Sequence, residues 1–129
     1  YGLCRNRDLL DRMCRLGQPW NVSTLAQAAG LVALDCPDWP EQARRLIQKE
    51  KPWLCGYLTA LGFEVLPGDA NYLFFSGAPG LYKKLLSRGV LIRDCANYRG
   101  LQPGDCRIAV RTRRENEELL KAIQEALDV

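Results

Sequence analysis

Histidine is absent from this sequence of 129 residues. Without histidine the chain cannot by itself build the Ser-His or Cys-His pairs that activate many protein nucleophiles. It also cannot form any metal site that needs an imidazole ligand. The composition therefore argues against a self-contained hydrolase.

Paired cysteine motifs are also missing. None of the cysteines forms a C-x-x-C pair, and the N-terminus does not resemble a signal peptide, so a zinc ribbon, a thioredoxin-type motif and a secreted disulfide framework all lack support. We expect reduced thiols and a cytoplasmic protein. The cysteines are residues 4, 14, 36, 55, 95 and 106.

Long apolar or basic runs are lacking as well. Every apolar run is broken well short of the roughly 20 residues that a membrane-spanning helix needs, so no membrane segment is expected. The net charge is only +3, and no basic cluster exceeds the one at 111–114, so a nucleic-acid partner is not expected. With 47% hydrophobic and 26% charged residues, the chain is long enough for a core and forms one domain or a piece of one.

The hydrophobic periodicity predicts an α+β fold. From residue 39 onward the order is helix, strand, strand, helix, strand, strand, helix, which favours a mainly antiparallel four-stranded sheet with helices on one face. Pro52 falls inside a long helical pattern and is expected to kink or split it. Residues 18–22 are expected to be extended. The expected helices are 7–16, 24–34, 39–61, 80–87 and one after the Thr112/Glu115 capping box, and the expected strands are 63–66, 71–75, 90–92 and 108–110.

Three arginines lie on or beside the last two expected strands. Arg93 follows the run 90–92, and Arg107 and Arg111 flank the run 108–110. The connection 96–105 contains two glycines and one proline and is too long for a tight hairpin, so it can lie over whatever these arginines bind. Guanidinium groups suit carboxylate or phosphate, which predicts an anion site. The alternative is ordinary solvated charge at strand ends.

Several segments resemble a known family in order and spacing. They are QPWNVSTLAQAA at 18–29, LGFEVLPGDANYLFF at 61–75, GVLIRDC at 89–95, and RIAVRT at 107–112 followed by ENEELL at 115–120. Together they resemble the C-terminal part of fold-type I pyridoxal-phosphate enzymes of the histidinol-phosphate aminotransferase group, and the match covers essentially the whole chain. Two features resemble the threonine-phosphate decarboxylase branch, which belongs to cobalamin biosynthesis. One is RDCANY at 93–98, and the other is Arg111 before Thr112, where aminotransferases usually have Gly-Thr.

The resemblance implies a fragment. In that group the cofactor lysine and a glycine-rich phosphate-binding segment lie upstream of the residues that match Tyr1, and the opening of this chain without a methionine fits the same expectation. Residues 1–34 would be the tail of the large domain and the interdomain crossover, and residues 35–129 the small domain. The lysines at 49, 51, 83, 84 and 121 are expected on solvated helix faces. The parent would bind pyridoxal phosphate, whereas this chain alone would bind none covalently and would be inactive.

The resemblance also assigns roles to particular residues. Arg107 matches the arginine that binds the substrate's carboxylate or anionic end, and Arg93 matches a second substrate-anion arginine. Arg111 departs from the common pattern, so it is either a third anion ligand or an exposed residue beside the helix cap. Trp20 and Asn21 mark the crossover, where an interdomain hinge is favoured over substrate contact. The substrate would be a small phosphorylated amino acid, the parent a homodimer and the fragment a monomer or weak dimer.

Two alternatives remain open. One is a fragment of a histidinol-phosphate-type aminotransferase. The other is a ferredoxin-like module that senses an anionic metabolite or docks a protein, which would not need the leading helices. The sequence upstream of Tyr1 would separate them, because a Ser-x-x-Lys-like segment with a glycine-rich arginine stretch there favours the enzyme.

Overall fold

The computed structural model describes residues 3–127 and divides the chain into two compact units, Tyr1–Trp39 and Pro40–Val129. The division falls near the start of a long helix, slightly later than the expected boundary at 34/35. That the first unit is the tail of a larger domain stays a prediction. Each unit is described by itself below.

The first unit holds two helices, and a polar side chain caps the start of each. Helix α1, Arg7–Leu16, begins at Asn6, whose side chain accepts a hydrogen bond from the Leu9 amide at 3.1 Å. Helix α2, Thr24–Leu34, begins at Ser23, whose Oγ accepts from the Ala26 amide at 3.2 Å. Neither helix has a buried residue.

The connection between α1 and α2 corrects one expectation. Residues 18–22 are not uniformly extended, because Pro19 and Trp20 form a turn in which Trp20 has a φ of 61°. Proline pre-sets the first central position of a turn, and a positive φ at the next position is what type II turns require. The turn leaves the Trp20 side chain 95% exposed.

The second unit contains most of helix α3, Asp38–Ala60, which is one continuous helix with Pro52 inside it. The expectation that Pro52 would split this helix is wrong. Proline removes one backbone hydrogen bond, but Glu50 before it and Leu54 and Leu58 after it are all buried on the same helix. Packing of this face therefore outweighs the local defect.

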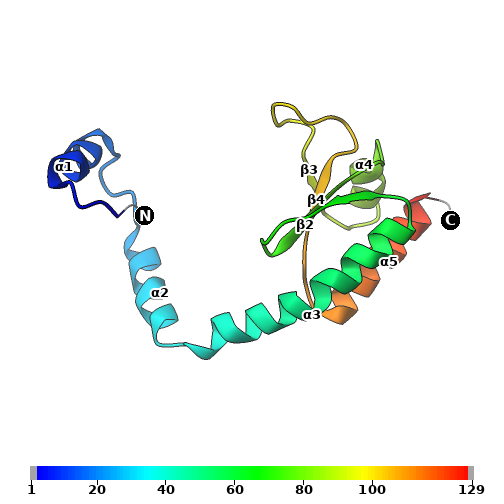
Figure 1. Ribbon diagram of the computed structural model, residues 1–129, viewed down its shortest axis with the longest axis horizontal. Helices are drawn as coiled ribbons and strands as arrows, with labels where there is room; N and C mark the ends of the chain where they lie inside the picture. Colours follow the sequence, from blue (N-terminus) through cyan, green and yellow to red (C-terminus); the bar gives the residue numbers. More distant parts are fainter. Residues whose placement is uncertain (1–2, 128–129) are drawn as a thin grey trace. The chain divides into compact units, whose positions relative to one another are not determined.

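The sheet of the second unit is four-stranded, antiparallel and ordered β1-β2-β4-β3 (Figure 1). Helix α4, Leu81–Leu86, and helix α5, Arg113–Leu127, complete the unit. The predicted α+β architecture is confirmed. The strands are β1 Glu64–Leu66, β2 Tyr72–Ser76, β3 Arg93–Asp94 and β4 Cys106–Ala109.

The core lies on one face of this sheet. Leu73 and Phe75 on β2 and Ile108 on β4 are buried, and they share a cluster with apolar side chains of α3, α4 and α5. Because side chains alternate along a strand, the residues between them point to the opposite face, which no helix of the second unit covers. That open face carries Tyr72, Phe74, Arg107 and Ala109. Among the core residues from the helices are Leu54, Leu58, Leu81, Leu85, Leu120 and Ile123.

The expected strand 90–92 is not a strand. The Val90 amide donates to the Leu85 carbonyl at the end of α4, and Ile92 turns its side chain into the core, so pairing with β4 starts only at Arg93. Strand β4 ends at Ala109, and Val110 stays beside β2, because its amide donates to the Asn71 carbonyl in register with the Tyr72–Ala109 pair. The two chain segments therefore separate beyond the Arg93–Arg107 pair.

Candidate functional site

Strand register places two of the three predicted arginines directly opposite each other. Arg93 on β3 and Arg107 on β4 are register partners in the antiparallel ladder, and Phe74 on β2 is the partner of Arg107 on its other side. Register partners point to the same face of a sheet. Both arginines therefore point to the open face of the sheet.

Arg107 stacks on an aromatic ring. Its guanidinium carbon lies 4.6 Å from the centre of the Tyr72 ring. Within residues 3–127 its side chain makes no ion pair and donates no hydrogen bond at the usual distances. A guanidinium whose face is stacked still presents its N–H donors at its edge, so Arg107 is available to an anion.

Arg93 is held by the loop between β3 and β4. Its guanidinium donates to Asn97 Oδ1 at 3.3 Å and lies 5.5 Å from the centre of the Tyr98 ring. The loop is closed at its base, where the Cys95 amide donates to the Asp105 carbonyl at 2.9 Å. Gly104 has a φ of 102°, and a Cβ there would lie 2.9 Å from Pro79 N, so this position requires glycine. The loop thus supplies both partners of Arg93.

A groove of about 880 Å³ lies where residues 89–92 separate from residues 108–111, next to the Arg93–Arg107 pair. It is lined by all three predicted arginines, so the structure brings Arg93, Arg107 and Arg111 to one concave surface. The unpaired residues Val90 and Leu91 also line it, so the missing strand is what opens the groove. Acidic side chains share the lining, namely Asp94, Glu115 and Glu118.

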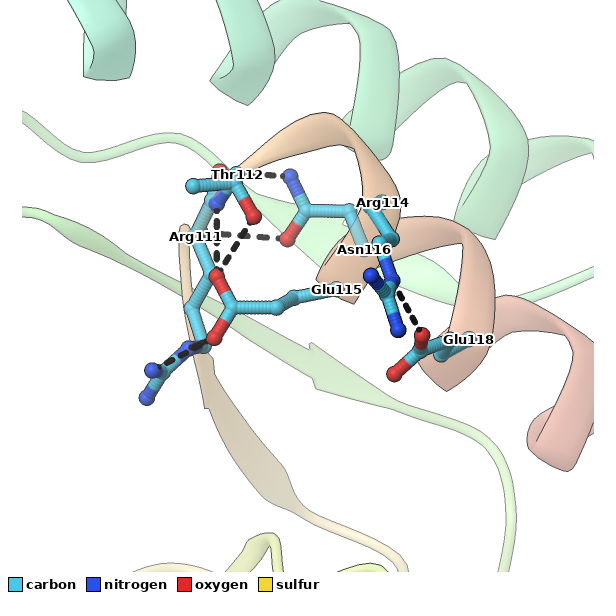
Figure 2. A network of polar contacts seen from close by, with 6 residues as sticks. All are labelled: Arg111, Thr112, Arg114, Glu115, Asn116 and Glu118. Carbon is cyan, nitrogen blue, oxygen red and sulfur yellow. Dashed lines mark hydrogen bonds and ion pairs between the residues drawn. The ribbon is translucent and has the colours of Figure 1, made fainter.

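Arg111 differs from the other two arginines because it has a carboxylate partner. Its guanidinium contacts Glu115 Oε1 at 2.6 to 2.7 Å, and Glu115 Oε2 accepts from the Thr112 amide and hydroxyl (Figure 2). The hydrogen bond from Arg111, followed by those from Thr112, lowers the pKa of Glu115 to about 2. The Glu115 half of the predicted capping box is therefore present. The positive charge of Arg111 is balanced by the Glu115 carboxylate of the same chain.

Asn116 fixes the backbone at the same junction. Its side-chain oxygen accepts from the Arg111 amide at 3.1 Å, and its side-chain nitrogen donates to the Arg111 carbonyl at 2.9 Å (Figure 2). Asn116 is only 1% exposed. One turn earlier, Arg113 Nε donates to the buried Glu50 carboxylate at 2.8 Å. The guanidinium carbon of Arg113 also lies 3.7 Å from the centre of the Trp53 ring. These two contacts connect the start of α5 to α3.

A second, smaller pocket of about 430 Å³ adjoins the groove on the open face. Arg107 and Tyr72 line both spaces, so they stand at the junction. The turn between β1 and β2 forms one rim, and Lys51 holds that turn by donating to the carbonyls of Gly68 and Ala70. Apolar and aromatic side chains make up much of the lining, including Leu66, Phe74, Tyr98 and Leu101.

The sequence did not single out Tyr72, Asn97 or Tyr98. Tyr72 alternates with buried Leu73 in the NYLFF run, so period two could have placed it on the open face. Which arginine it meets depends on the pairing of β2 with β4, which no local pattern gives. Asn97 and Tyr98 lie in the RDCANY segment, which carries the resemblance but predicts no contact with Arg93.

Trp20 and Asn21, the predicted hinge residues, lie in the first unit. Trp20 lies in the turn after α1, and Asn21 follows it before α2. Their role as an interdomain hinge stays a prediction.

The lysines of the chain lie outside both the groove and the smaller pocket. Lys51 holds the β1–β2 turn, Lys84 donates to the Ala126 carbonyl at 2.8 Å, and Lys121 lies 4.0 Å from Glu125. Lys49 and Lys83 are exposed on helices. Residues 3–127 thus offer no lysine at the arginine site for a covalently bound cofactor. The same residues hold no cluster suited to a metal ion, and none of their helices is long and apolar enough to cross a membrane.

The similar proteins include members of two enzyme groups. The histidinol-phosphate aminotransferase of Anaeromyxobacter sp. is 39% identical over 95% of this chain, and the threonine-phosphate decarboxylase of Salmonella typhimurium is 38% identical over 92%. In both cases the chain spans 34% of the relative's length.

Solved structures share the fold. The histidinol-phosphate aminotransferase of Clostridium acetobutylicum matches 96% of this chain, and 39% of its own, with a TM-score of 0.83 at 24% identity. The L-threonine-O-3-phosphate decarboxylase of Porphyromonas gingivalis matches 96% of this chain, and 40% of its own, with a TM-score of 0.73 at 28% identity. The family model described as aminotransferase class I and II matches residues 1–123. The chain therefore belongs to the aminotransferase class I and II family.

Proposed function

We propose that this chain is the C-terminal part of a pyridoxal-phosphate-dependent enzyme that acts on a small phosphorylated amino acid, as its threonine-phosphate decarboxylase relatives are named for doing. In this proposal Arg93 and Arg107 bind the anionic groups of the substrate. The observation that carries it is the register pairing of these two arginines on the open face, without a carboxylate partner for either within residues 3–127.

Electrostatics supports an anion between these residues. Like charges directly opposite on neighbouring strands are destabilising, so an unoccupied Arg93–Arg107 pair carries a cost. A phosphate or carboxylate placed between them would remove that cost and accept charge-assisted hydrogen bonds from both guanidinium forks. The groove is open and large enough for a small metabolite.

The cofactor would be held by other parts of the polypeptide. Because no lysine lies at the arginine site, we assign no step of the chemistry to pyridoxal phosphate on these residues. The chain spans about a third of the length of its relatives, so the remaining two thirds would supply the cofactor lysine. On this account residues 3–127 bind and orient the substrate and catalyse nothing alone. A homodimeric whole protein and a cytoplasmic location stay predictions.

A histidinol-phosphate-type aminotransferase is the second candidate. The Arg111–Glu115 ion pair favours it, because Glu115 balances the positive charge of Arg111. Only two of the three groove arginines then remain for the substrate, which suits a substrate whose one anionic group is a phosphate. The identities of 39% and 38% to the two groups do not separate them. A stand-alone ferredoxin-like module is disfavoured, because the family match at 1–123 includes the leading helices.

An assay of the whole protein with two substrates tests the proposal. With added pyridoxal phosphate, O-phospho-L-threonine should release carbon dioxide, whereas histidinol phosphate with a 2-oxo acid acceptor should give little amino transfer. The reverse result would replace the decarboxylase with the aminotransferase. Turnover of neither substrate, at protein concentrations where pyridoxal phosphate is bound, would remove the phosphorylated amino acid as the substrate class.

A further inference from the structure

Tyr72 is placed by the sheet to meet Arg107 from the side. Phe74, not Tyr72, is the register partner of Arg107, and Tyr72 stands opposite Ala109. Tyr72 is therefore a diagonal neighbour of Arg107 on the same face, at a separation of about 7 to 8 Å that aromatic and long side chains can bridge. The Arg107 side chain spans this diagonal, and its guanidinium carbon lies 4.6 Å from the ring centre.

The contact uses only one part of the guanidinium. A cation over an aromatic ring is attracted by the negative face of the ring, and the phenolic hydroxyl of tyrosine is not needed. The in-plane N–H donors of Arg107 remain free, as its lack of hydrogen bonds within residues 3–127 shows. The ring thus fixes the position of the charge without using the donors that an anion needs.

The position so fixed is specific. Arg107 and Tyr72 are both at the junction of the groove and the smaller pocket. Arg93, the register partner of Arg107, lies over a different ring, that of Tyr98. The two arginines are register partners on neighbouring strands, but each guanidinium lies over a different aromatic ring, and the two rings belong to separate chain segments.

We infer that Tyr72 is a positioning residue for Arg107, and that its ring holds the guanidinium at the junction of the groove and the smaller pocket so that its N–H edge meets an incoming anion. This inference rests on the proposed function, because it assigns to Arg107 the binding of an anion. Tyr72 itself transfers no proton and makes no bond to the anion in this account. Its contribution is to reduce the rotamer freedom that a long arginine side chain loses on binding.

The test uses the 129-residue chain, inorganic phosphate as the probe, and nuclear magnetic resonance of the arginine side chains. In the unchanged chain, the ring current of Tyr72 should shift the Arg107 side-chain protons upfield, and phosphate should perturb the Arg107 Nε–H signal. Tyr72→Leu should abolish the ring-current shift and weaken phosphate affinity about two- to fivefold, as expected for the loss of an exposed cation–π contact. Tyr72→Phe should retain both properties.

Tyr57→Leu is the matched control, because Tyr57 is 50% exposed on α3 and lies outside both the groove and the smaller pocket. It should leave phosphate affinity unchanged. Equal affinity in Tyr72→Leu and the unchanged chain would overturn the inference. So would equal weakening in Tyr72→Phe and Tyr72→Leu, because the hydroxyl would then be the binding group.

Arg107→Lys separates this inference from the proposed function. If Arg107→Lys weakens phosphate binding and Tyr72→Leu does not, the anion site stands and the positioning role falls. If phosphate does not bind the unchanged chain, the proposed anion site loses its support. The ring-current shift then still decides whether Tyr72 holds Arg107.

Discussion

The guanidinium of Arg111 contacts the Glu115 carboxylate at 2.6 Å, although both residues line the groove that holds the other two arginines. The pair lies at the start of α5, where Glu115 also accepts from the Thr112 amide. Glu115 thus serves the helix cap and Arg111 at once. The Arg111–Glu115 pair therefore leads to two predictions, one for the stability of the chain and one for the choice of substrate.

The first prediction concerns the pH dependence of stability. The folded-state pKa of Glu115 is lowered to about 2, so its stabilising contribution is present above its ordinary pKa of about 4.3 and is lost as pH falls toward 2. Glu115→Gln should therefore be less stable than the unchanged chain at pH 7, and the difference should shrink between about pH 4.5 and 2. Urea unfolding across this range measures it. A difference independent of pH would mean that the carboxylate charge is not what matters.

The second prediction concerns Arg111 in the whole protein. Arg111→Gly restores the residue expected in aminotransferases. If Arg111 leaves Glu115 to bind substrate, the change should lower kcat/KM more for a substrate with both carboxylate and phosphate than for one with phosphate alone. Paired assays with O-phospho-L-threonine and histidinol phosphate give this ratio. An unchanged ratio would show that Arg111 serves only the helix cap.

The third prediction concerns Asn116. Asn116→Ala removes the partners of both the amide and the carbonyl of Arg111 at a site where the Asn116 side chain is buried. The free energy of unfolding should fall by about 1 to 3 kcal/mol. Gln124→Ala, an exposed position on the same helix, is the control and should change it by no more than about 0.5 kcal/mol. Chemical denaturation of both variants provides the comparison, and equal stabilities would mean that water replaces the lost bonds.

The fourth prediction concerns the cofactor. Because no lysine lies at the arginine site, incubation of the 129-residue chain with stoichiometric pyridoxal phosphate, followed by borohydride reduction, should give no specific single-site adduct by intact mass. Lys51 and Lys84 are already engaged with backbone carbonyls. A clean adduct on one lysine would contradict the proposal that the cofactor is held elsewhere.

Local signals were enough to place most of the elements. Asn6 and Ser23 cap the first two helices as their side-chain chemistry predicts, because an N-cap depends on residues within one turn. The period of two in residues 71–75 likewise gave β2 to within a residue. The expected split of the helix at Pro52 is wrong, because the local penalty of proline is outweighed by burial of the surrounding helix face, which depends on the rest of the fold.

The candidate site depended on information that is not local. The sequence indicated that Arg93 and Arg107 lie on or beside two successive strands, but their pairing is a matter of register, which the folded sheet fixes. The 90–92 run has β-branched and aliphatic residues and still leaves the sheet, because its first amide bonds to α4. The groove that results, and the ion pair that compensates Arg111, could not be read from residue types.

The kcat/KM of Arg107→Lys in the whole protein, with O-phospho-L-threonine as substrate, tests most directly whether Arg107 binds the substrate anion. Lysine keeps the charge but loses the planar two-point contact and the stacking on Tyr72, so kcat/KM should fall about 10- to 1,000-fold while stability is little changed. Arg99→Lys is the control, because Arg99 is exposed in the β3–β4 loop outside the groove, and it should retain full activity. Equal kinetics for Arg107→Lys and Arg99→Lys would contradict the assignment of Arg107 to the substrate anion.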